Sequence, residues 1–576
     1  MNEKYSLLFP KEDAEYRTLS STVIHDLGLD AVCRQIAPKE TEQNLLVNTL
    51  SKITADPYVI KYRCDVFEDI LNNANMRKEL LAILERISFL KNYGSICKNF
   101  DDKSTIWDLM HRFDEINDYI KCVDALHDCL AEQDIHSNGL TGLKKYIEKI
   151  YADNGFAQLK EDISKLELDT SNLKSITVGI NLNERFEASS VGLVSINSRY
   201  FTRSNALSNF ADHISSKDRI NATTDWNEDY KYHEPNAHDL SVVGNAIFKM
   251  GGFTAARMNP LYSAAAVASV AEGDAAQNVP FYFDRVVNQM ISGMVKKLKN
   301  ILNKYVSLSV TNMVELIPEL MYYVSWAEFI EQQRAKGMIF SKPAVIEAGD
   351  GFSVKAKEIY NIKLIHGENA SEIVTNDISF DEKHRMYILT GANRGGKTTV
   401  TQAVGQLFVL AQGGIYIPGE AFEFSPVDSV FTHFPADEDK TFDLGRLGEE
   451  CKRFKEIFSE ATAKSLVLMN ETFSTTSFEE GYFIAVDSIR ALLTKGIRTI
   501  YNTHMHKLAL DIDVMNDGST IAKAYSLVVC NDGANRSYKV KIAPPQGKSF
   551  ASDIAKKYGV TYEMLMDESK DNEEIK

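Results

Sequence analysis

The nine residues from Gly391 to Thr399, GANRGGKTT, constrain the fold of this chain more than any other part of its sequence. They satisfy the pattern G-x-x-x-x-G-K-[ST], in which glycines let successive backbone N–H groups turn inward towards phosphate oxygens. The strand-like residues Met386 to Leu389 precede the loop, and the helical pattern TTVTQAVGQLFVLAQ follows its lysine. A strand, a glycine loop and a helix in this order predict a P-loop that binds a nucleoside triphosphate.

The residue types in this loop predict how the triphosphate is held. The helix that begins near Lys397 presents the positive end of its dipole to phosphate. Lys397 is expected to reach the β- and γ-phosphates, and the Thr398 hydroxyl to bind Mg²⁺. The predicted ligands are therefore ATP and Mg²⁺. The predicted nucleotide contacts are Gly391, Ala392, Asn393, Arg394, Gly395, Gly396, Lys397, Thr398 and Thr399.

Two further apolar runs end in polar residues suited to hydrolysis. The run Ser465 to Met469 ends in Asn470-Glu471, where Glu471 is placed to polarise the attacking water. Asn470 stands where a metal-binding aspartate is expected, and an amide oxygen brings no charge, so we predict nucleotide binding with slow or Mg²⁺-weak hydrolysis. The run Arg498 to Tyr501 leads into His504, which could sense the γ-phosphate and orient water.

The remaining sequence predicts a multidomain protein, because 576 residues are too many for one hydrophobic core. Apolar residues recur at helical spacing before residue 151 and again after residue 280, whereas Ile176 to Ile180 and Val191 to Ile196 alternate as strands do. Beyond Lys342-Pro343 the pattern becomes strand, loop and helix, typical of an α/β domain. The predicted division is a segment 1–40, helices 41–170, a β-containing insert 171–245, returning helices 246–342, an α/β P-loop domain 343–565 and an acidic tail 566–576.

Composition excludes some classes of protein. The net charge of −16 disfavours general binding to nucleic acid, although a local basic channel on an acidic body stays possible. The seven cysteines form no Cys-x-x-Cys pair, which fits a reduced cytosol better than a disulfide framework, and Cys122 and Cys129 are expected on a buried helix face. The sequence shows no signal segment and no long apolar run, so we expect a cytoplasmic protein without a membrane partner.

Three segments carry a resemblance to a known family. TGANRGGKTT, LVLMNETFSTTSFEEG (Leu466 to Gly481) and NTHMHKLA (Asn502 to Ala509) resemble, in the same order and at similar intervals, the ATPase domain of the MutS family of DNA mismatch-repair proteins. The segment AQGGIYIPGEA and the hairpin ending in Ser537-Tyr538 are also similar to that domain. The helices, the insert and the returning helices look more loosely like the lever and clamp of the family.

This resemblance implies an ABC-type ATPase domain in a homodimer, with each ATP held between the P-loop of one subunit and the signature segment of the other. It implies that Asn393, Gly396, Lys397 and Thr398 bind nucleotide and Mg²⁺. It further implies that Glu471 is the catalytic base, that His504 is the γ-phosphate histidine and that Thr475 to Ser477 lie at the dimer seam.

The sequence also departs from the family pattern. Asn470 replaces the usual aspartate beside the metal. The nearest match to the signature segment, Asp443 to Glu449, lacks the family's serine, which bears on sensing between subunits. The chain begins with lever-like helices, and we find no counterpart of the mismatch-reading domain or of an endonuclease tail. Reading of mismatches is therefore not predicted.

Two functions from different classes remain open at this stage. One is a homodimeric ATP-gated clamp on duplex or branched DNA, related to DNA repair, with slow hydrolysis. The alternative is a nucleotide-switched protein that binds RNA, a ribosomal particle or a protein partner with little hydrolysis; a small-molecule kinase is a third reading. Weaker candidates for contact with a phosphate backbone are Lys296, Lys297, Lys299 and Lys304 on a returning helix, and Arg199 and Arg203 in the insert, and each set could equally be a solvated face.

Overall fold

A computed structural model describes most of the chain outside the insert. The described residues are 5–10, 15–87, 106–165, 175–182, 188–197, 292–305, 311–347, 352–365, 372–392, 394–435, 445–516, 518, 521–532, 535–545 and 558–565. Our predictions for Asn393, for Arg199 and Arg203, for the first two residues of the signature-like segment and for the acidic tail lie outside them.

The chain forms two compact units. One comprises residues 1–86, 126–148 and 312–576, and the other comprises residues 87–125 and 149–311. Within the described ranges, we find no helix with both the length and the apolar character needed to cross a bilayer. The six-part division by residue number stays a prediction.

The second unit contains helices and a two-stranded sheet. The strands β3 (Ser175–Leu182) and β4 (Ala188–Asn197) pair antiparallel where the alternating apolar pattern predicts two strands. The helix α8 (Asn154–Ser164) is tied to α13 (Ser292–Lys304), because Asp162 accepts hydrogen bonds from Lys304 at 3.1 Å and from Tyr305 at 2.8 Å.

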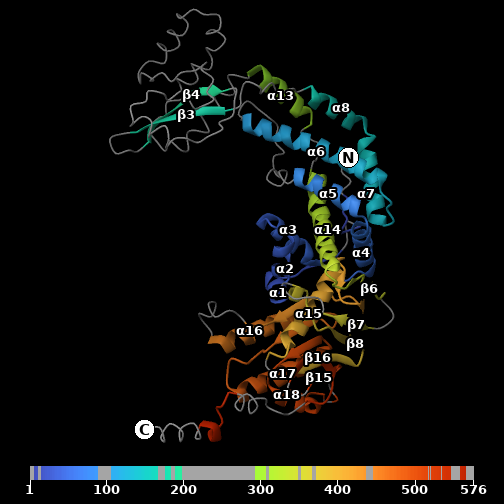
Figure 1. Ribbon diagram of the computed structural model, residues 1–576, viewed down its shortest axis with the longest axis vertical. Coiled ribbons are helices and arrows are strands. Elements are labelled where there is room, and N and C mark those ends of the chain that lie inside the picture. The colour runs from blue at the N-terminus through green and yellow to red at the C-terminus, as the bar shows by residue number, and fades with distance from the viewer. Residues whose placement is uncertain are drawn as a thin grey trace, which may run out of the picture. The chain divides into compact units, whose positions relative to one another are not determined.

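Helices also make up the N-terminal part of the first unit (Figure 1). The helix α4 begins at the predicted Asp56-Pro57, since the Asp56 carboxylate accepts the Tyr58 N–H at 2.8 Å and Pro57 occupies the first turn. Cys122 and Cys129 are buried on α6, whose residues up to 125 belong to the second unit, and their burial confirms the predicted apolar helix face. The helices that contribute to this unit are α1 (Ser21–Asp26), α2 (Leu29–Ile36), α3 (Glu40–Leu50), α4 (Pro57–Asn72), α5 (Ala74–Ile87), α6 (Ile106–Glu132), α7 (Asn138–Tyr151) and α14 (Thr311–Ala335).

A six-stranded sheet organises the C-terminal part of the first unit. Its order is β12-β13-β14-β9-β15-β16, and neighbouring strands run parallel except for the antiparallel pair β15 and β16. Three of these strands, β9, β13 and β14, lie where short apolar runs predict them. The bounds are β9 (His384–Thr390), β12 (Val430–His433), β13 (Leu466–Asn470), β14 (Arg498–Asn502), β15 (Lys523–Asp532) and β16 (Asn535–Ile542).

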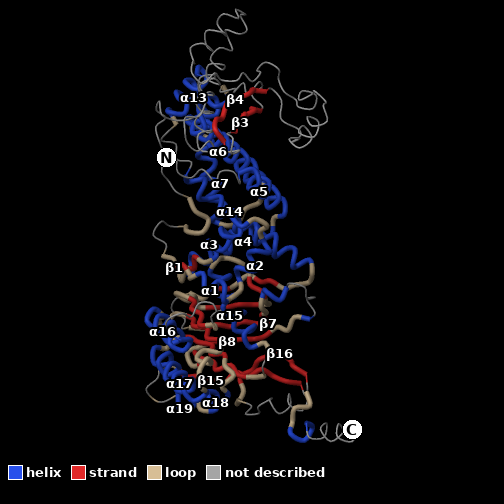
Figure 2. Tube along the Cα trace, turned by 90° about the vertical axis from the view of Figure 1, so that its left-hand side faces the viewer, coloured by secondary structure: helices blue, strands red, loops and turns tan. Residues whose placement is uncertain are grey.

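Helices cover both faces of this sheet. The P-loop helix α15 (Lys397–Gln412) packs on one face, where Gly405 lies against Leu468 of β13. The opposite face buries Val467 and Met469 against the other helices, which lie beside the strands in Figure 2. These helices are α16 (Gly445–Glu460), α17 (Phe478–Lys495), α18 (His506–Leu510) and α19 (Ile512–Met515). Alternate residues of one strand thus serve two cores, as in a layered α/β domain.

The first unit also contains a four-stranded sheet, with the strand order β6-β11-β7-β8. Its strands are β6 (Ala344–Val345), β7 (Val354–Ile359), β8 (Asn376–Phe380) and β11 (Ala421–Phe424), and a separate antiparallel pair joins β5 (Phe340–Ser341) to β10 (Ile417–Pro418). The short 3₁₀ helix Ile362–Ile365 follows β7. These elements and the segments between them contribute residues that line the cavity beside the P-loop described below, namely Ile359, Tyr360, Asn361, Leu364, Glu372, Ile373, Val374 and Asn376.

The N-terminal helices pack directly on the P-loop helix. The Gln402 side chain donates to the Asp26 carbonyl at 2.7 Å, and Gln406 donates to the Leu27 carbonyl at 2.8 Å. Leu27 also fills the space that a side chain at Gly405 would need. The helix α15 is therefore buried along almost its whole length, and sequences far apart in the chain form one core.

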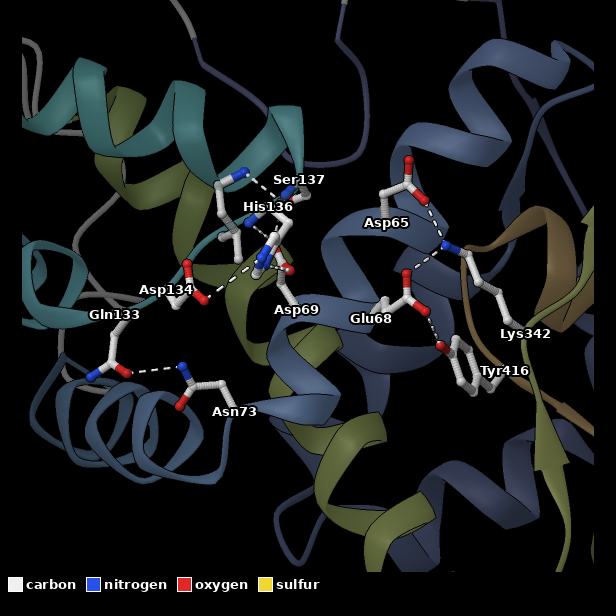
Figure 3. Close-up of polar contacts among 11 residues, drawn as sticks. Asp65, Glu68, Asp69, Asn73, Gln133, Asp134, His136, Ser137, Lys342 and Tyr416 are labelled. Atoms are coloured by element: carbon white, nitrogen blue, oxygen red, sulfur yellow. Dashed lines mark hydrogen bonds and ion pairs between the residues drawn. The ribbon is translucent and has the colours of Figure 1, made fainter.

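The helix α4 makes polar contacts with several parts of the first unit, and Figure 3 shows those of Asp65, Glu68 and Asp69. The buried Arg63 guanidinium donates to the Gln412 carbonyl at 2.8 Å, and Lys342 bridges Asp65 and Glu68 at 2.7 and 2.6 Å. Further along α4, Asp69 accepts the backbone N–H groups of His136 and Ser137, which come directly before α7, at 3.0 and 2.7 Å. The polar contacts of α4 thus reach both the P-loop helix and the residues that precede α7.

Candidate active site

The predicted site residues meet at one edge of the six-stranded sheet. In the parallel register Asn470 is opposite Asn502, and Asn502 is opposite Leu389, so β9, β13 and β14 end at the same level. The P-loop follows β9, Glu471 follows β13 and His504 follows β14. Ligands of open α/β sheets bind at the carboxyl ends of the strands, which is where this arrangement lies.

The P-loop curves around the lysine ammonium. Lys397 donates to the carbonyl oxygens of Gly391 and Ala392 at 3.2 and 3.3 Å, and the Gly395 N–H closes a turn on Ala392 at 3.0 Å. Gly396 has a φ of +86°, which a residue with a side chain adopts only at a cost. Burial lowers the pKa of Lys397, and the nearby Glu471 carboxylate opposes this change. A desolvated cation without a bound carboxylate is a suitable partner for a polyphosphate.

Asn470 and Thr398 lie side by side, as the metal prediction requires. The Thr398 hydroxyl donates to the Asn470 side-chain oxygen at 2.9 Å, and the Asn502 amide donates to the same oxygen and, at 3.3 Å, to the Thr398 hydroxyl. The Asn502 side-chain oxygen is buried and has no hydrogen-bond partner within the described ranges. A buried oxygen of this kind could accept a hydrogen bond from water on a hydrated cation.

This donor set fits Mg²⁺, which prefers oxygen ligands and keeps several of its waters. Thr398 and Asn470 would hold the ion or its waters, and Asn502 would orient them. The set lacks a carboxylate beside Thr398, since Asn470 takes the place of the expected aspartate. Slow or Mg²⁺-weak hydrolysis therefore stays a prediction that this donor set motivates.

The turn after β13 positions Glu471 with unusual backbone geometry. Glu471 and Phe473 have φ values of +51° and +61°, and each such residue costs roughly 1–2 kcal/mol. The Glu471 N–H donates to the Asn502 carbonyl at 2.9 Å, and Glu471 is among the residues lining the cavity beside the P-loop. Backbone strain of this kind is often found where a catalytic side chain must point in one direction.

Two histidines follow β14, and the sequence analysis singled out only one of them. His504 is exposed, whereas His506 is half-buried. Burial lowers the pKa of His506, and the charges of Lys397 and His504 lower it further. His506 is therefore close enough to the P-loop lysine to feel its charge. The sequence N-T-H-M-H, which begins at the last residue of β14, contains both histidines. His506 could therefore have been found by considering every histidine close to the end of this strand.

A cavity of about 630 Å³ opens beside the P-loop. This volume is in the usual range of small-molecule sites. One wall is formed by residues 394–400 and Glu471, and the other by apolar residues including Ile359, Leu364 and Val374. Tyr538, whose φ is +54°, places its ring against Gly396 at this cavity. Its backbone is held by Asn376, which donates to the Tyr538 carbonyl at 3.2 Å.

The structure also places the signature-like segment and two of the lysines that were candidates for phosphate contact. Residues 445–449 of the signature-like segment form the start of α16. Lys304 is paired with Asp162 within its own unit, which favours a structural role for this side chain, while Lys296 is exposed on α13. Within the described ranges, no cluster of three or more His, Cys, Asp or Glu side chains could hold a metal ion.

Comparisons with known proteins agree with this architecture in two places. A family model described as MutS domain V matches residues 387–576, which contain the P-loop, β13, β14 and the hairpin of β15 and β16. A second family model, described as MutS2 N-terminal domain, matches residues 55–335, which include α4, α6, α7 and α14.

Curated relatives carry related names. The chain is 32% identical over 237 residues to a DNA mismatch repair protein MutS of Prochlorococcus marinus, covering 39% of this chain and 25% of that protein. It is 27% identical over 194 residues to an Endonuclease MutS2 of Thermus thermophilus, covering 34% of this chain and 25% of that protein. The chain therefore spans about a quarter of the length of these relatives.

Proposed function

Since this chain belongs to the MutS family, we propose that it is an ATP-binding and ATP-hydrolysing protein that acts as a homodimeric, nucleotide-gated clamp on DNA. The observation that carries the proposal is the convergence of the P-loop, Glu471 and His504 at one sheet edge, beside a cavity of about 630 Å³. DNA as ligand and the dimer rest on the family alone. Duplex or branched DNA is the proposed substrate of the clamp.

In this proposal each residue of the site has one task. The backbone N–H groups of residues 391–399 and the Lys397 ammonium bind the triphosphate. Glu471 accepts the proton of the attacking water, and His504, supported by His506, orients the γ-phosphate. Mg²⁺ bound near Thr398 would neutralise charge on the phosphates. Tyr538 and the apolar cavity wall offer a surface for the nucleobase, because aromatic rings stack on bases.

The contacts of α15 support a mechanical link between nucleotide and clamp. The P-loop precedes this helix, and its other end is held by Arg63 of α4 and by Tyr322 of α14, which donates to the Gly413 carbonyl at 3.0 Å. A buried helix moves as a unit, because packed cores shift between discrete arrangements and do not deform continuously. A shift of α15 on ATP binding would therefore displace α4 and α14.

Replacing Asn470 with aspartate is expected to raise hydrolysis at limiting Mg²⁺ by about 10- to 100-fold. Aspartate can still accept the hydrogen bonds from Thr398 and Asn502, so the change adds one negative charge and little else. Single-turnover hydrolysis over a range of Mg²⁺ concentrations measures the effect. An unchanged rate and an unchanged Mg²⁺ dependence would show that the amide is not what limits catalysis.

Asn470 and the net charge of −16 also favour the alternative, a nucleotide-switched protein that binds RNA, a ribosomal particle or a protein partner with little hydrolysis. Titration of labelled duplex DNA at several salt concentrations, with and without ATP, separates the two. The clamp predicts ATP-dependent binding whose logarithm falls with the logarithm of salt concentration, by about 0.9 per phosphate contacted. DNA binding that is absent under all conditions, together with ATP-dependent binding to RNA, would favour the alternative.

A further inference from the structure

The turn after β13, which carries Glu471, is hydrogen-bonded to the helix α16. Glu450 belongs to α16 and is half-buried, and its carboxylate accepts the Phe473 N–H at 2.6 Å. The Thr475 side chain also hydrogen-bonds to this carboxylate. A hydrogen bond to an ionised acceptor is shorter and stronger than one between neutral groups. Glu450 therefore holds the turn at Phe473, which has a positive φ as Glu471 does.

A second connection joins the same helix to the same turn. Burial lowers the pKa of His433 to about 4, so this imidazole is neutral at physiological pH. Its Nε2 donates to the Glu450 carbonyl at 3.0 Å, and its Nδ1 therefore accepts from the Thr472 hydroxyl at 3.1 Å. The side chain and the backbone of Glu450 are thus both linked to residues 472 and 473.

The surroundings of Phe473 leave the turn little freedom once these bonds are made. Its ring is buried between His433 and Phe454, with ring centroids at 5.9 and 5.8 Å. Its carbonyl would lie 2.3 Å from a Cβ at Gly481, so only glycine lets α17 approach this closely. Glu450 itself is not among the described residues that line the nucleotide cavity.

From this geometry we infer that Glu450 is a positioning residue for ATP hydrolysis, which acts by holding the turn that directs Glu471 into the cavity. The inference rests on the proposed role of Glu471 as the base. Glu450 lies on α16, directly after residues 445–449. A displacement of the start of this helix would therefore be passed to Glu471 through the Glu450 carboxylate. Loss of that carboxylate leaves the P-loop and Lys397 intact, so it should affect the rate of hydrolysis and not the affinity for nucleotide.

Four variants of the full chain test this role. In single-turnover hydrolysis with Mg²⁺, Glu450→Ala is expected to be slower than the wild type by about 10-fold or more, since small displacements of a catalytic group are costly. Glu450→Gln should retain most of the rate, because its amide oxygen can accept the Phe473 N–H. Glu450→Asp, which keeps the charge on a shorter side chain, should lie between the two. Glu456→Ala removes an exposed carboxylate of the same helix and should match the wild type.

Titration with a fluorescent ATP analogue supplies the second measurement, and all four variants should bind it within about twofold of the wild type. A wild-type rate in Glu450→Ala, a rate in Glu450→Gln as low as in Glu450→Ala, or a loss of affinity that parallels the loss of rate would each overturn the inference. Glu471→Gln serves as the reference. If Glu471→Gln loses turnover while Glu450→Ala does not, the role of Glu450 is refuted and the proposed function stands. If the wild type itself has no turnover, both the role of Glu450 and the proposed function are refuted.

Discussion

Replacing Lys397 with alanine is expected to weaken ATP binding by roughly 100-fold or more and to abolish measurable hydrolysis. Lys397 is only 5% exposed, and in the proposed complex its ammonium would donate at least two hydrogen bonds to phosphate. A hydrogen bond to a charged group contributes about 1.5–3 kcal/mol, so the loss of two corresponds to about 3 kcal/mol or more. Isothermal titration with ATP and with ADP measures the effect.

The folded state should tolerate this substitution. Burial lowers the pKa of Lys397, which means that the folded, nucleotide-free protein disfavours the charged form of this side chain. The thermal unfolding midpoint of the variant without nucleotide should therefore equal or exceed that of the wild type. Lys383→Ala, which removes an exposed lysine just before β9, is the matched control. ATP affinity within threefold of the wild type in Lys397→Ala would refute the P-loop assignment.

Replacing Glu471 with glutamine is expected to lower the rate of ATP hydrolysis by about 10²- to 10⁴-fold while ATP still binds. Glutamine has the same size but cannot take a proton from water, and general base catalysis contributes a factor of this order. Glu471 has a positive φ, and glutamine meets the same steric cost there as glutamate, so the substitution adds no backbone strain. Rapid-quench measurement of phosphate release and filter binding of labelled ATP separate the two effects.

A protein that binds ATP without hydrolysing it should also remain in its ATP-bound conformation. If the clamp proposal holds, Glu471→Gln in ATP should show the DNA-binding behaviour of the wild type in a non-hydrolysable analogue. Glu479→Gln, an exposed position on α17, is the control and should hydrolyse ATP normally. Undiminished turnover in Glu471→Gln would assign the base to another residue, and His506 near Lys397 would then be the next to test.

Sequence reasoning was successful where the information is local. The P-loop needs glycines, a lysine and a hydroxyl within nine residues, and the strands before and after it are short apolar runs bounded by polar residues. The structure confirms β9, β13, β14 and α15 where these runs predict them. The pair β3 and β4 was predictable for the same reason, since strand alternation is visible in the residues themselves.

Residues that act through neighbours distant in sequence were not predicted. No role was predicted for Asn502, yet its amide lies against both Asn470 and Thr398. Tyr538 reaches Gly396 only because the last two strands fold back beside the P-loop. Glu450 looks like an ordinary polar residue of an amphipathic helix until its contact with Phe473 is seen.

By itself the sequence determined the chemistry of the loop, because the turn that presents backbone N–H groups to phosphate depends on residue types at fixed spacing. It also determined the strand ends that carry Asn470, Glu471 and His504. Only the tertiary structure decided which strands are neighbours, and so which of these side chains meet, because strand order and register come from contacts between residues far apart in the chain. The same holds for the contacts of α15 with Asp26 and Leu27 at the end of α1 and for its attachment to α4, since packing against distant helices leaves no pattern in the local sequence.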